Sequence, residues 1–493
     1  MIGAVTKFKE TKIAERLRGF FMGPIYPALV CLIALFGHVF AIEFYLNIVN
    51  MLLISIGLAV CTSLRPAIVV LCTFTYQISV KNTPGEPTWS DYYFTDGRSV
   101  VIVALFVIVA IALLFFFISN GLFTKKRLLS LPHGISFPIL TLAFLLSGVS
   151  SPAWTPGDLG YAAVQVVCLY IVFYLLYLGL SGENMHELAE YFAYVCALIT
   201  FLLVGEMINA FITSDSAIVD GSINRNIFAL GWGISNVLGM NLVSLLPMLF
   251  YGVIRSKRPI TYFLIAVLNY VAVLVVLSRN SMLFGSIIFA VCLIISCFFG
   301  ERRRLCRILS AALLTVALVV SIFLLDEILL LLQRYVTSGF SDSGRFDLWR
   351  FGFDSFLEYP LFGKGFFGME VPLTDMAEFL PNMVHNTLFQ LLGATGIFGT
   401  LAYALYRLET LVPFFRRPTL EKTLLGICAS TVVLESLLDN FIFYMQTTFV
   451  YAVALAIAFL IYDGDRTENN RPIDARISVW TGRGRCGAKQ KSE

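Results

Sequence analysis

Long apolar runs alternate with short polar connections along this chain, a pattern that predicts membrane-spanning helices. We expect fourteen spans, at residues 22–42, 45–63, 66–80, 99–118, 136–150, 159–180, 187–212, 233–254, 259–277, 280–299, 305–325, 386–406, 423–440 and 441–462. The runs that begin at 66 and 136 and the final pair are at or below the roughly 17 to 25 residues that a perpendicular span needs. Kinked or re-entrant segments are therefore alternatives to full spans for these runs, and the expected number of spans is about twelve to fourteen.

One long polar interruption covers residues 326–385. It contains the sequence GRFDLWR at 344–350 and leads into VHN at 384–386. A polar insertion of 60 residues between two apolar helices is uncommon unless it carries function. The pattern therefore predicts an active-site loop.

Composition agrees with this class. Hydrophobic residues make up 58% and charged residues 14% of the 493 residues, and the mean hydropathy is +0.82. Soluble domains contain roughly 45 to 50% apolar residues. We therefore expect an all-α polytopic membrane protein with one membrane domain, in contact with membrane lipids and without a nucleic-acid partner.

The distribution of basic residues predicts the orientation. With a cytoplasmic N-terminus, 27 of the 35 Lys and Arg residues lie in cytoplasmic segments, as the positive-inside rule requires. The expected order is a cytoplasmic segment at 1–19, eleven transmembrane helices in 20–325, an extracytoplasmic catalytic loop with short interfacial helices at 326–385, three transmembrane helices in 386–462 and a basic cytoplasmic tail at 463–493. None of the ten cysteines falls in an outer loop, so no disulfide framework is predicted. Neither CxxC nor paired histidines at ligand spacing occur, so no metal site is predicted.

A few residues that are expected on the outer side have side chains suited to binding a ligand. Arg225 in INRN, Arg279 in SRNS and Arg345 in GRFD are cations on an outer surface otherwise rich in carboxylates, which indicates an anionic ligand. Arg345 falls in the first turn of an expected helix over 344–358, where its charge and the unpaired N–H groups predict a phosphate site. Beyond this helix, Gly363 and Gly365 permit close approach of chain or ligand.

Apolar side chains recur in the 344–358 helix at spacings of three and four, which favours a helix on the membrane surface. They are Phe346, Trp349, Phe353, Phe356 and Leu357. His385, at the end of the loop, is the single histidine expected outside, since His38 lies in the first span and His133 and His186 are expected in the cytoplasm. A histidine at the water boundary can be neutral near pH 7 and accept a proton from a hydroxyl nucleophile.

Three blocks resemble the signature sequences of the O-antigen ligase and O-antigen polymerase superfamily. They are SRNSMLFG at 278–285, GRFDLWRFGFDSFLEYPLFGKGFF at 344–367 and HNTLFQLLGATGIFG at 385–399. GWGISNVLGMNLVSLLP at 231–247 resembles the upstream block of that superfamily, so the resemblance covers roughly residues 225–405.

The resemblance implies a multi-pass GT-C-type glycosyltransferase of the bacterial inner membrane, which takes a glycan from undecaprenyl diphosphate and uses no metal ion or other cofactor. Arginines that match Arg279 and Arg345 are expected to hold the diphosphate, and the histidine that matches His385 is the candidate base. These three are the expected catalytic residues. The residues expected to contact substrate are Arg225, Asn236, Trp349, Arg350, Gly363, Gly365 and Asn386.

The same chemistry follows from the expected location. No nucleotide sugar is available outside the cytoplasm, so an outward-facing transferase needs a donor that is anchored in the bilayer, such as a lipid diphosphate. Two arginines would bind its phosphates in place of a divalent cation and stabilise the leaving group. A base on the opposite face of the anomeric carbon would give inversion.

Several interpretations stay open. Polymerisation of surface polysaccharide repeat units is the leading one, with a chain-length regulator as an expected partner, and ligation of the glycan to a lipid or protein acceptor is the alternative. A lipid-linked oligosaccharide flippase is the alternative from another class, although it predicts internal repeats and cations within spans, which we do not find. Glu435 and Asp439, four residues apart near the outer end of the thirteenth span, are further candidates because carboxylates are costly in a membrane.

Overall fold

The computed structural model describes residues 11–77, 97–124, 131–219, 221–231, 234–300, 302–323, 344–369, 383–416 and 418–469. These residues form helices, apart from connections and one antiparallel hairpin of β1 (Ile218–Val219) and β2 (Ser222–Ile223). The all-α class predicted from the sequence is confirmed.

The helices have the following bounds. The N-terminal half contains α2 (Lys12–Met22), α3 (Ile25–Phe40), α4 (Glu43–Val60), α5 (Ala67–Gln77), α7 (Arg98–Ser119), α9 (Ser136–Leu145), α10 (Pro156–Val166), the π-helix η1 (Val167–Ile171), α11 (Val172–Gly179) and α12 (Met185–Thr213). The C-terminal half contains the 3-10 helix η2 (Arg225–Phe228), α13 (Ser235–Arg255), α14 (Pro259–Val275), α15 (Arg279–Phe298), α16 (Arg303–Phe323), α18 (Arg345–Glu358), α19 (Thr387–Phe415), α20 (Leu420–Glu435), the 3-10 helix η3 (Phe441–Phe443) and α21 (Met445–Asn469).

Among the described residues, nine helices are long and apolar enough to cross a membrane, and α2 with α3, bent by 63°, makes a tenth. The nine are α4, α7, α10 through α11, α12, α13, α15, α16, α19 and α21. All fourteen predicted runs coincide with helices, but α5, α9, α14 and the 16-residue α20 are shorter than these spans. The sequence predicts that α5, α9 and α20 are short, whereas α14 is shorter than predicted and α21 is longer.

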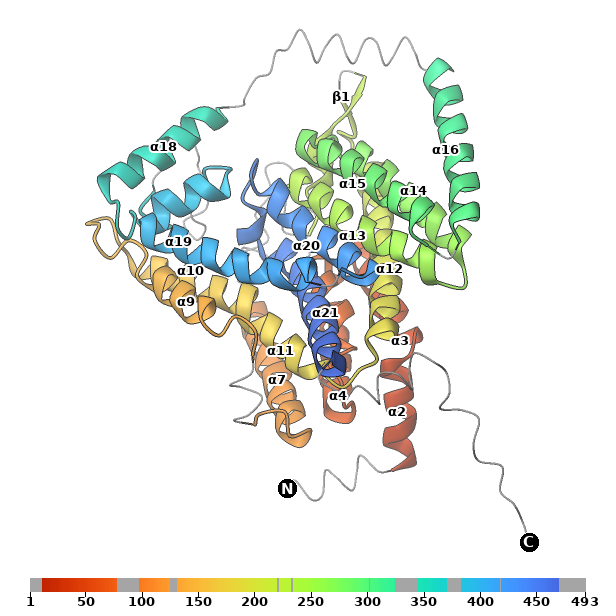
Figure 1. Ribbon diagram of the computed structural model, residues 1–493, viewed down its shortest axis with the longest axis horizontal. Helices are drawn as coiled ribbons and strands as arrows, with labels where there is room; N and C mark the ends of the chain where they lie inside the picture. The colour runs from red at the N-terminus through yellow and green to blue at the C-terminus, as the bar shows by residue number, and fades with distance from the viewer. Residues whose placement is uncertain are drawn as a thin grey trace.

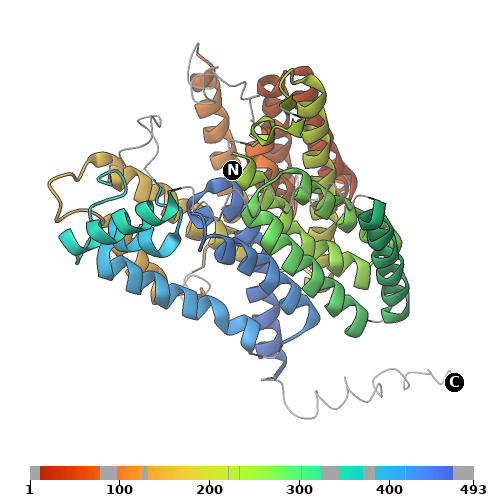
Figure 2. The same cartoon turned by 90° about the horizontal axis from the view of Figure 1, so that it is seen from above.

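Helix α13 is the centre of the bundle. Every residue of its 18-residue apolar window is buried, and α12, α14, α15 and α20 pack around it (Figure 1). A helix that is apolar on all sides is typically enclosed by other helices. In contrast, α7 and α16 lie at the edges of the bundle (Figure 2), with only 17% and 11% of their apolar windows buried. Their exposed apolar faces are suited to lipid.

Helix α19 is broken at Gly396, whose φ of 65° and ψ of −163° are not helical. The loop after α18 packs into this break, where the backbone N–H groups of Lys364 and Gly365 donate to the carbonyls of Gly393 and Ala394 at 2.8 and 3.0 Å. Backbone groups released by a break inside a membrane domain need such partners. Part of the predicted outer loop is therefore inserted into the bundle rather than lying above it.

The two ends of the described chain lie on one side. The start of α2 and the end of α21 lie at the lower end of Figure 1, whereas α18 and the hairpin lie at the upper end. Arg255 at the end of α13 pairs with Glu421 at the start of α20 at 3.1 Å. Which side faces the cytoplasm stays a prediction from the charge distribution.

Candidate active site

Residues 435–440, the last residue of α20 and the turn that follows it, connect three other parts of the chain. We call them the α20 turn. The start of α15 bonds to Glu435 and α18 bonds to Leu438. The start of α19 bonds to Ser436, Leu437 and Asp439. Side chains from three helices therefore meet at one short segment.

His385 lies directly before the N-cap of α19 and contacts this turn. Its Nδ1 lies 2.8 Å from Oδ1 of Asp439, and the carboxylate is 2% exposed whereas the imidazole is 31% exposed. Because an ionised carboxylate can only accept a hydrogen bond, we assign the imidazole proton to Nδ1, which leaves a lone pair on Nε2. The φ of His385 is 53°, a strained left-handed conformation of a kind that clusters at functional sites.

The start of α19 is fixed by two amide side chains. Oδ1 of Asn386 accepts from backbone N–H groups of the first turn, and its Nδ2 donates to the carbonyl of Leu437 at 2.7 Å. Oε1 of Gln390 accepts from the backbone of Val384 at 2.9 Å and from the side chain of Asn440 at 3.0 Å. These bonds hold the backbone on both sides of the histidine.

Helix α18 is attached to the same place. Nη1 of Arg345 donates to the carbonyl of Leu438 at 2.6 Å, and Nε1 of Trp349 donates to the carbonyl of His385 at 3.3 Å. The Trp349 ring also stacks on Phe389 of α19, with centroids 5.8 Å apart. A guanidinium has five N–H donors, so the bond to Leu438 leaves Arg345 able to bind an anion as well.

The remaining surface of α18 is exposed and carries both apolar and charged side chains. Phe346, Phe353 and Leu357 are 64%, 41% and 61% exposed, which fits the predicted interfacial helix. Arg350 is also exposed and pairs with Asp354, one turn away, at 3.8 Å. No described contact joins Arg350 to the α20 turn.

Arg279 is the first residue of α15, and its side chain is exposed. The next two residues fix this helix end, since Nδ2 of Asn280 donates to the carbonyl of Glu435 and Oγ of Ser281 donates to Oε2 of Glu435, both at 3.2 Å. Glu435 is fully buried. The structure thus places the helix end that carries Arg279 against the same turn that binds Arg345 and His385.

Arg225 and Asn236 are less closely connected to this place. Arg225 begins η2, Asn236 lies in the first turn of α13, and no hydrogen bond between described residues joins either to the α20 turn. Gly239, one turn after Asn236, packs so closely on α15 that a β-carbon there would lie 2.6 Å from Oγ of Ser281. The start of α13 therefore lies beside the start of α15.

Gly363 and Gly365 have protein beside them. Their φ angles are 71° and 93°, and added β-carbons would lie 2.3 Å from the backbone carbon of Ala394 and 2.6 Å from Oδ1 of Asp158. The same Asp158 oxygen accepts from the backbone of Phe367 at 2.8 Å. The sequence permits close approach of either the chain or a ligand at these glycines. In the structure, another part of the chain lies against both of them.

The other three histidines lie elsewhere. His133 lies before α9, 3.4 Å from Glu409, and burial lowers the pKa of His133 to about 3. His186 is 76% exposed beside Glu421, and His38 is buried at the end of α3. Of the four histidines, His385 is the one that contacts the α20 turn.

Sequence reasoning missed most of the α20 turn. It singled out Glu435 and Asp439 as carboxylates but found no partner for either, because 54 residues separate His385 from Asp439. The polar residues Ser281 and Asn440 were not selected. The available signal was their position, since hydrogen-bonding side chains within apolar spans usually have a partner on another helix.

Residues 263–404 match the protein-family model described as O-antigen ligase. Over these residues the chain is similar to the O-antigen ligase family. This match confirms the predicted relation to the O-antigen ligase and polymerase superfamily, and it includes Arg279, Arg345 and His385. Arg225, Asn236 and the α20 turn lie outside the matched residues. No curated protein matches the chain.

Proposed function

We propose that this O-antigen ligase family protein transfers a glycan from undecaprenyl diphosphate to an acceptor hydroxyl at the outer face of the bacterial cytoplasmic membrane. The observation that carries the proposal is the His385–Asp439 pair at a turn that also binds Arg345 and the start of α15. A partly exposed base at a turn that also binds Arg345 and the helix end that carries Arg279 is suited to deprotonating a hydroxyl while an anionic group leaves.

In the proposed reaction, the acceptor oxygen attacks the anomeric carbon of the donor sugar. Its proton moves to Nε2 of His385, and the bond between the anomeric carbon and the diphosphate oxygen breaks. Asp439 keeps the proton of the neutral imidazole on Nδ1 and stabilises the imidazolium that forms, as the carboxylate of a catalytic triad does. Attack from the face opposite the diphosphate inverts the anomeric centre.

Arg279 and Arg345 are proposed to bind the diphosphate. Charge-assisted hydrogen bonds to phosphate oxygens strengthen as negative charge develops on the leaving group, so they stabilise the transition state. In this role they replace a divalent cation. The described residues hold no group of three or more His, Cys, Asp or Glu side chains that could hold a metal ion, and metal independence itself stays a prediction.

Polymerisation of repeat units is the proposed reaction, and ligation is the second candidate because the matched family model is described as O-antigen ligase. The two differ in the acceptor alone. A polymerase extends a second lipid-linked oligosaccharide, whereas a ligase transfers the glycan to a different lipid or to a protein. Purified protein with the lipid-linked donor as the sole glycan would form dimers and longer products if it is a polymerase.

The proposal as a whole is tested with His385→Ala in purified full-length protein and a defined lipid-linked oligosaccharide. We expect donor binding to remain and transfer to slow by about 100- to 10,000-fold, the usual range for loss of a general base. The matched control is His186→Ala, the same change at the exposed histidine beside Glu421, which should retain transfer. Full turnover by the His385 variant, or loss of transfer on addition of a chelator, would contradict the mechanism.

A further inference from the structure

A second group of ionisable side chains lies in α3, α4 and α12, helices for which no described hydrogen bond leads to the α20 turn. His38 at the end of α3, Glu43 at the start of α4 and Glu206 in α12 are 0%, 4% and 0% exposed. Nδ1 of His38 lies 3.8 Å from Oε1 of Glu43. Helix α3 packs against both α4 and α12, so the three side chains belong to neighbouring helices.

Glu206 is the unusual member of this group. Both of its carboxyl oxygens are buried and have no hydrogen-bond partner among the described residues. It lies seven residues before the end of α12, about 10 Å along the helix axis at roughly 1.5 Å per residue. An ionised carboxylate that is buried there without a partner is so costly that the group takes up a proton instead.

The charges around Glu206 give it no compensating cation. Glu43 of α4 acts on it electrostatically, and Cys31 of α3 and Tyr76 of α5 are the other titratable groups that interact with it. Helices α13, α14 and α21 and η2 also pack against α12, and no ionisable group on their described residues interacts with Glu206. A proton on Glu206 therefore removes a repulsion between two carboxylates.

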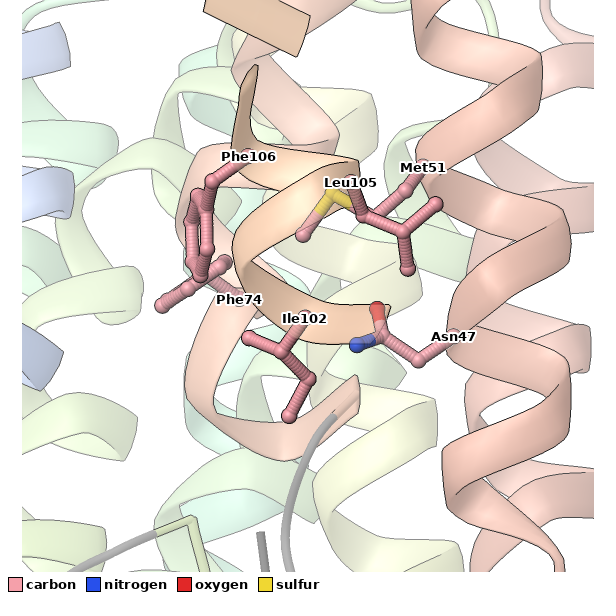
Figure 3. A pocket seen from close by; sticks show the side chains of 6 residues that line it. All are labelled: Asn47, Met51, Phe74, Ile102, Leu105 and Phe106. Carbon is pink, nitrogen blue, oxygen red and sulfur yellow. The ribbon is translucent and has the colours of Figure 1, made fainter. Parts of the chain in front are cut away.

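Amide groups on the same helices are also left with unused hydrogen-bonding atoms. Asn47, one turn after Glu43, has a buried Oδ1 without a partner among the described residues, as do Oδ1 of Asn50 and Nδ2 of Asn209. Figure 3 shows Asn47 as the polar member of a small pocket between α4, α5 and α7, which is otherwise lined by apolar side chains. The pocket brings a polar group to within one turn of Glu43.

We propose that His38, Glu43 and Glu206 form a proton-binding site inside the membrane domain, separate from the proposed transferase site. With His38 protonated, Glu43 ionised and Glu206 protonated, the group has no net charge. Loss of the proton from Glu206 adds a second negative charge beside that of Glu43, between α3, α4 and α12. The proton is thus the ligand that keeps these helices packed.

The test uses dicyclohexylcarbodiimide, an apolar reagent that adds to protonated carboxyl groups, on full-length protein in lipid nanodiscs. Mass spectrometry of peptides should find the adduct on Glu206, with labelling that falls as the pH rises. The control is Glu421, which is also buried, at 4% exposure, but is paired with Arg255 at 3.1 Å and should stay unlabelled. Glu206→Gln, which imitates the protonated group, should fold and lose the adduct.

Two further measurements decide the assignment. Glu43→Gln removes the neighbouring negative charge, so labelling of Glu206 should be lost at a lower pH than in the wild type. Infrared spectra should contain a protonated carboxyl band that Glu206→Gln removes, whether or not the reagent enters. Absence of this band difference, an unchanged pH profile in Glu43→Gln, or protection by sodium at constant pH would overturn the proton site.

Discussion

Replacing Asp439 with asparagine tests the part of the proposed mechanism that depends most on the structure. Asparagine keeps an oxygen that can accept from Nδ1 of His385, now at 2.8 Å, and from the backbone N–H of Asn440, now at 2.9 Å. The geometry of the α20 turn should therefore survive. What is lost is the negative charge beside the imidazole when it takes up the proton of the acceptor hydroxyl.

The size of the effect can be worked out from this contact. Two unit charges about 4 Å apart interact by about 4 kcal/mol at an effective dielectric constant of about 20. His385 is 31% exposed, and solvent screening reduces this to about 2 to 3 kcal/mol. At about 1.4 kcal/mol for each tenfold change, Asp439→Asn should slow transfer by about 30- to 150-fold. Donor binding should be unchanged, because the diphosphate is proposed to bind the arginines.

The assay follows product formation from a defined lipid-linked oligosaccharide by gel shift, alongside donor binding. Asp354→Asn makes the same carboxylate-to-amide change on the exposed face of α18 and serves as the control. In a His385→Ala background, Asp439→Asn should cause no further loss, because the two residues act as one unit. Wild-type transfer by the single variant, or an equal loss in both backgrounds, would refute the reasoning.

Three other predictions concern the arginines, the loop and the orientation. Arg279→Ala and Arg345→Ala should each slow polymer formation by about 30- to 1,000-fold, for a loss of about 2 to 4 kcal/mol, and lysine should rescue only partly, as gel analysis of product length would measure. Gly363→Ala should lower the thermal unfolding temperature, because a β-carbon at φ 71° would lie 2.3 Å from the backbone of α19. In a cysteine-free background, Glu358→Cys should react with an impermeant maleimide from outside and Lys257→Cys should not. The reverse labelling would show that the predicted orientation is wrong.

The sequence predicts the helices well because lipid demands long apolar runs. It does not predict the break in α19, since Gly396 lies in a run whose hydropathy matches that of an unbroken helix. The break depends on hydrogen bonds from α19 to the backbone at 360–365. This segment lies well before the break in the sequence and carries no hydropathy signal of its own. Tertiary hydrogen bonds of this kind are invisible to a pattern of apolar residues.

The site also has one part that the sequence predicts and one part that only the structure shows. Arg345 and His385 are recognisable from their predicted outward position and from the blocks that resemble the family, and the structure brings both to the α20 turn. Asn386, predicted to contact substrate, is a helix cap tied to Leu437. Asp439 has a partner only because α20 and α19 meet in space. Residue type and position therefore identify candidate groups, whereas packing decides which of them act on each other.

The position of the site follows from the shortness of α20. Carbonyls in the turn after a helix have no donor within that helix, and inside a membrane domain each must find another one. The consecutive carbonyls of residues 435–438 accept from the side chain of Asn280, the backbone of Thr387, the side chain of Asn386 and the guanidinium of Arg345, in that order. The negative end of the helix dipole also favours cationic groups there. The need to satisfy the carbonyls of the α20 turn thus draws the starts of α15, α18 and α19 together, and the same hydrogen bonds bring the proposed base, Arg345 and the helix end that carries Arg279 to one place.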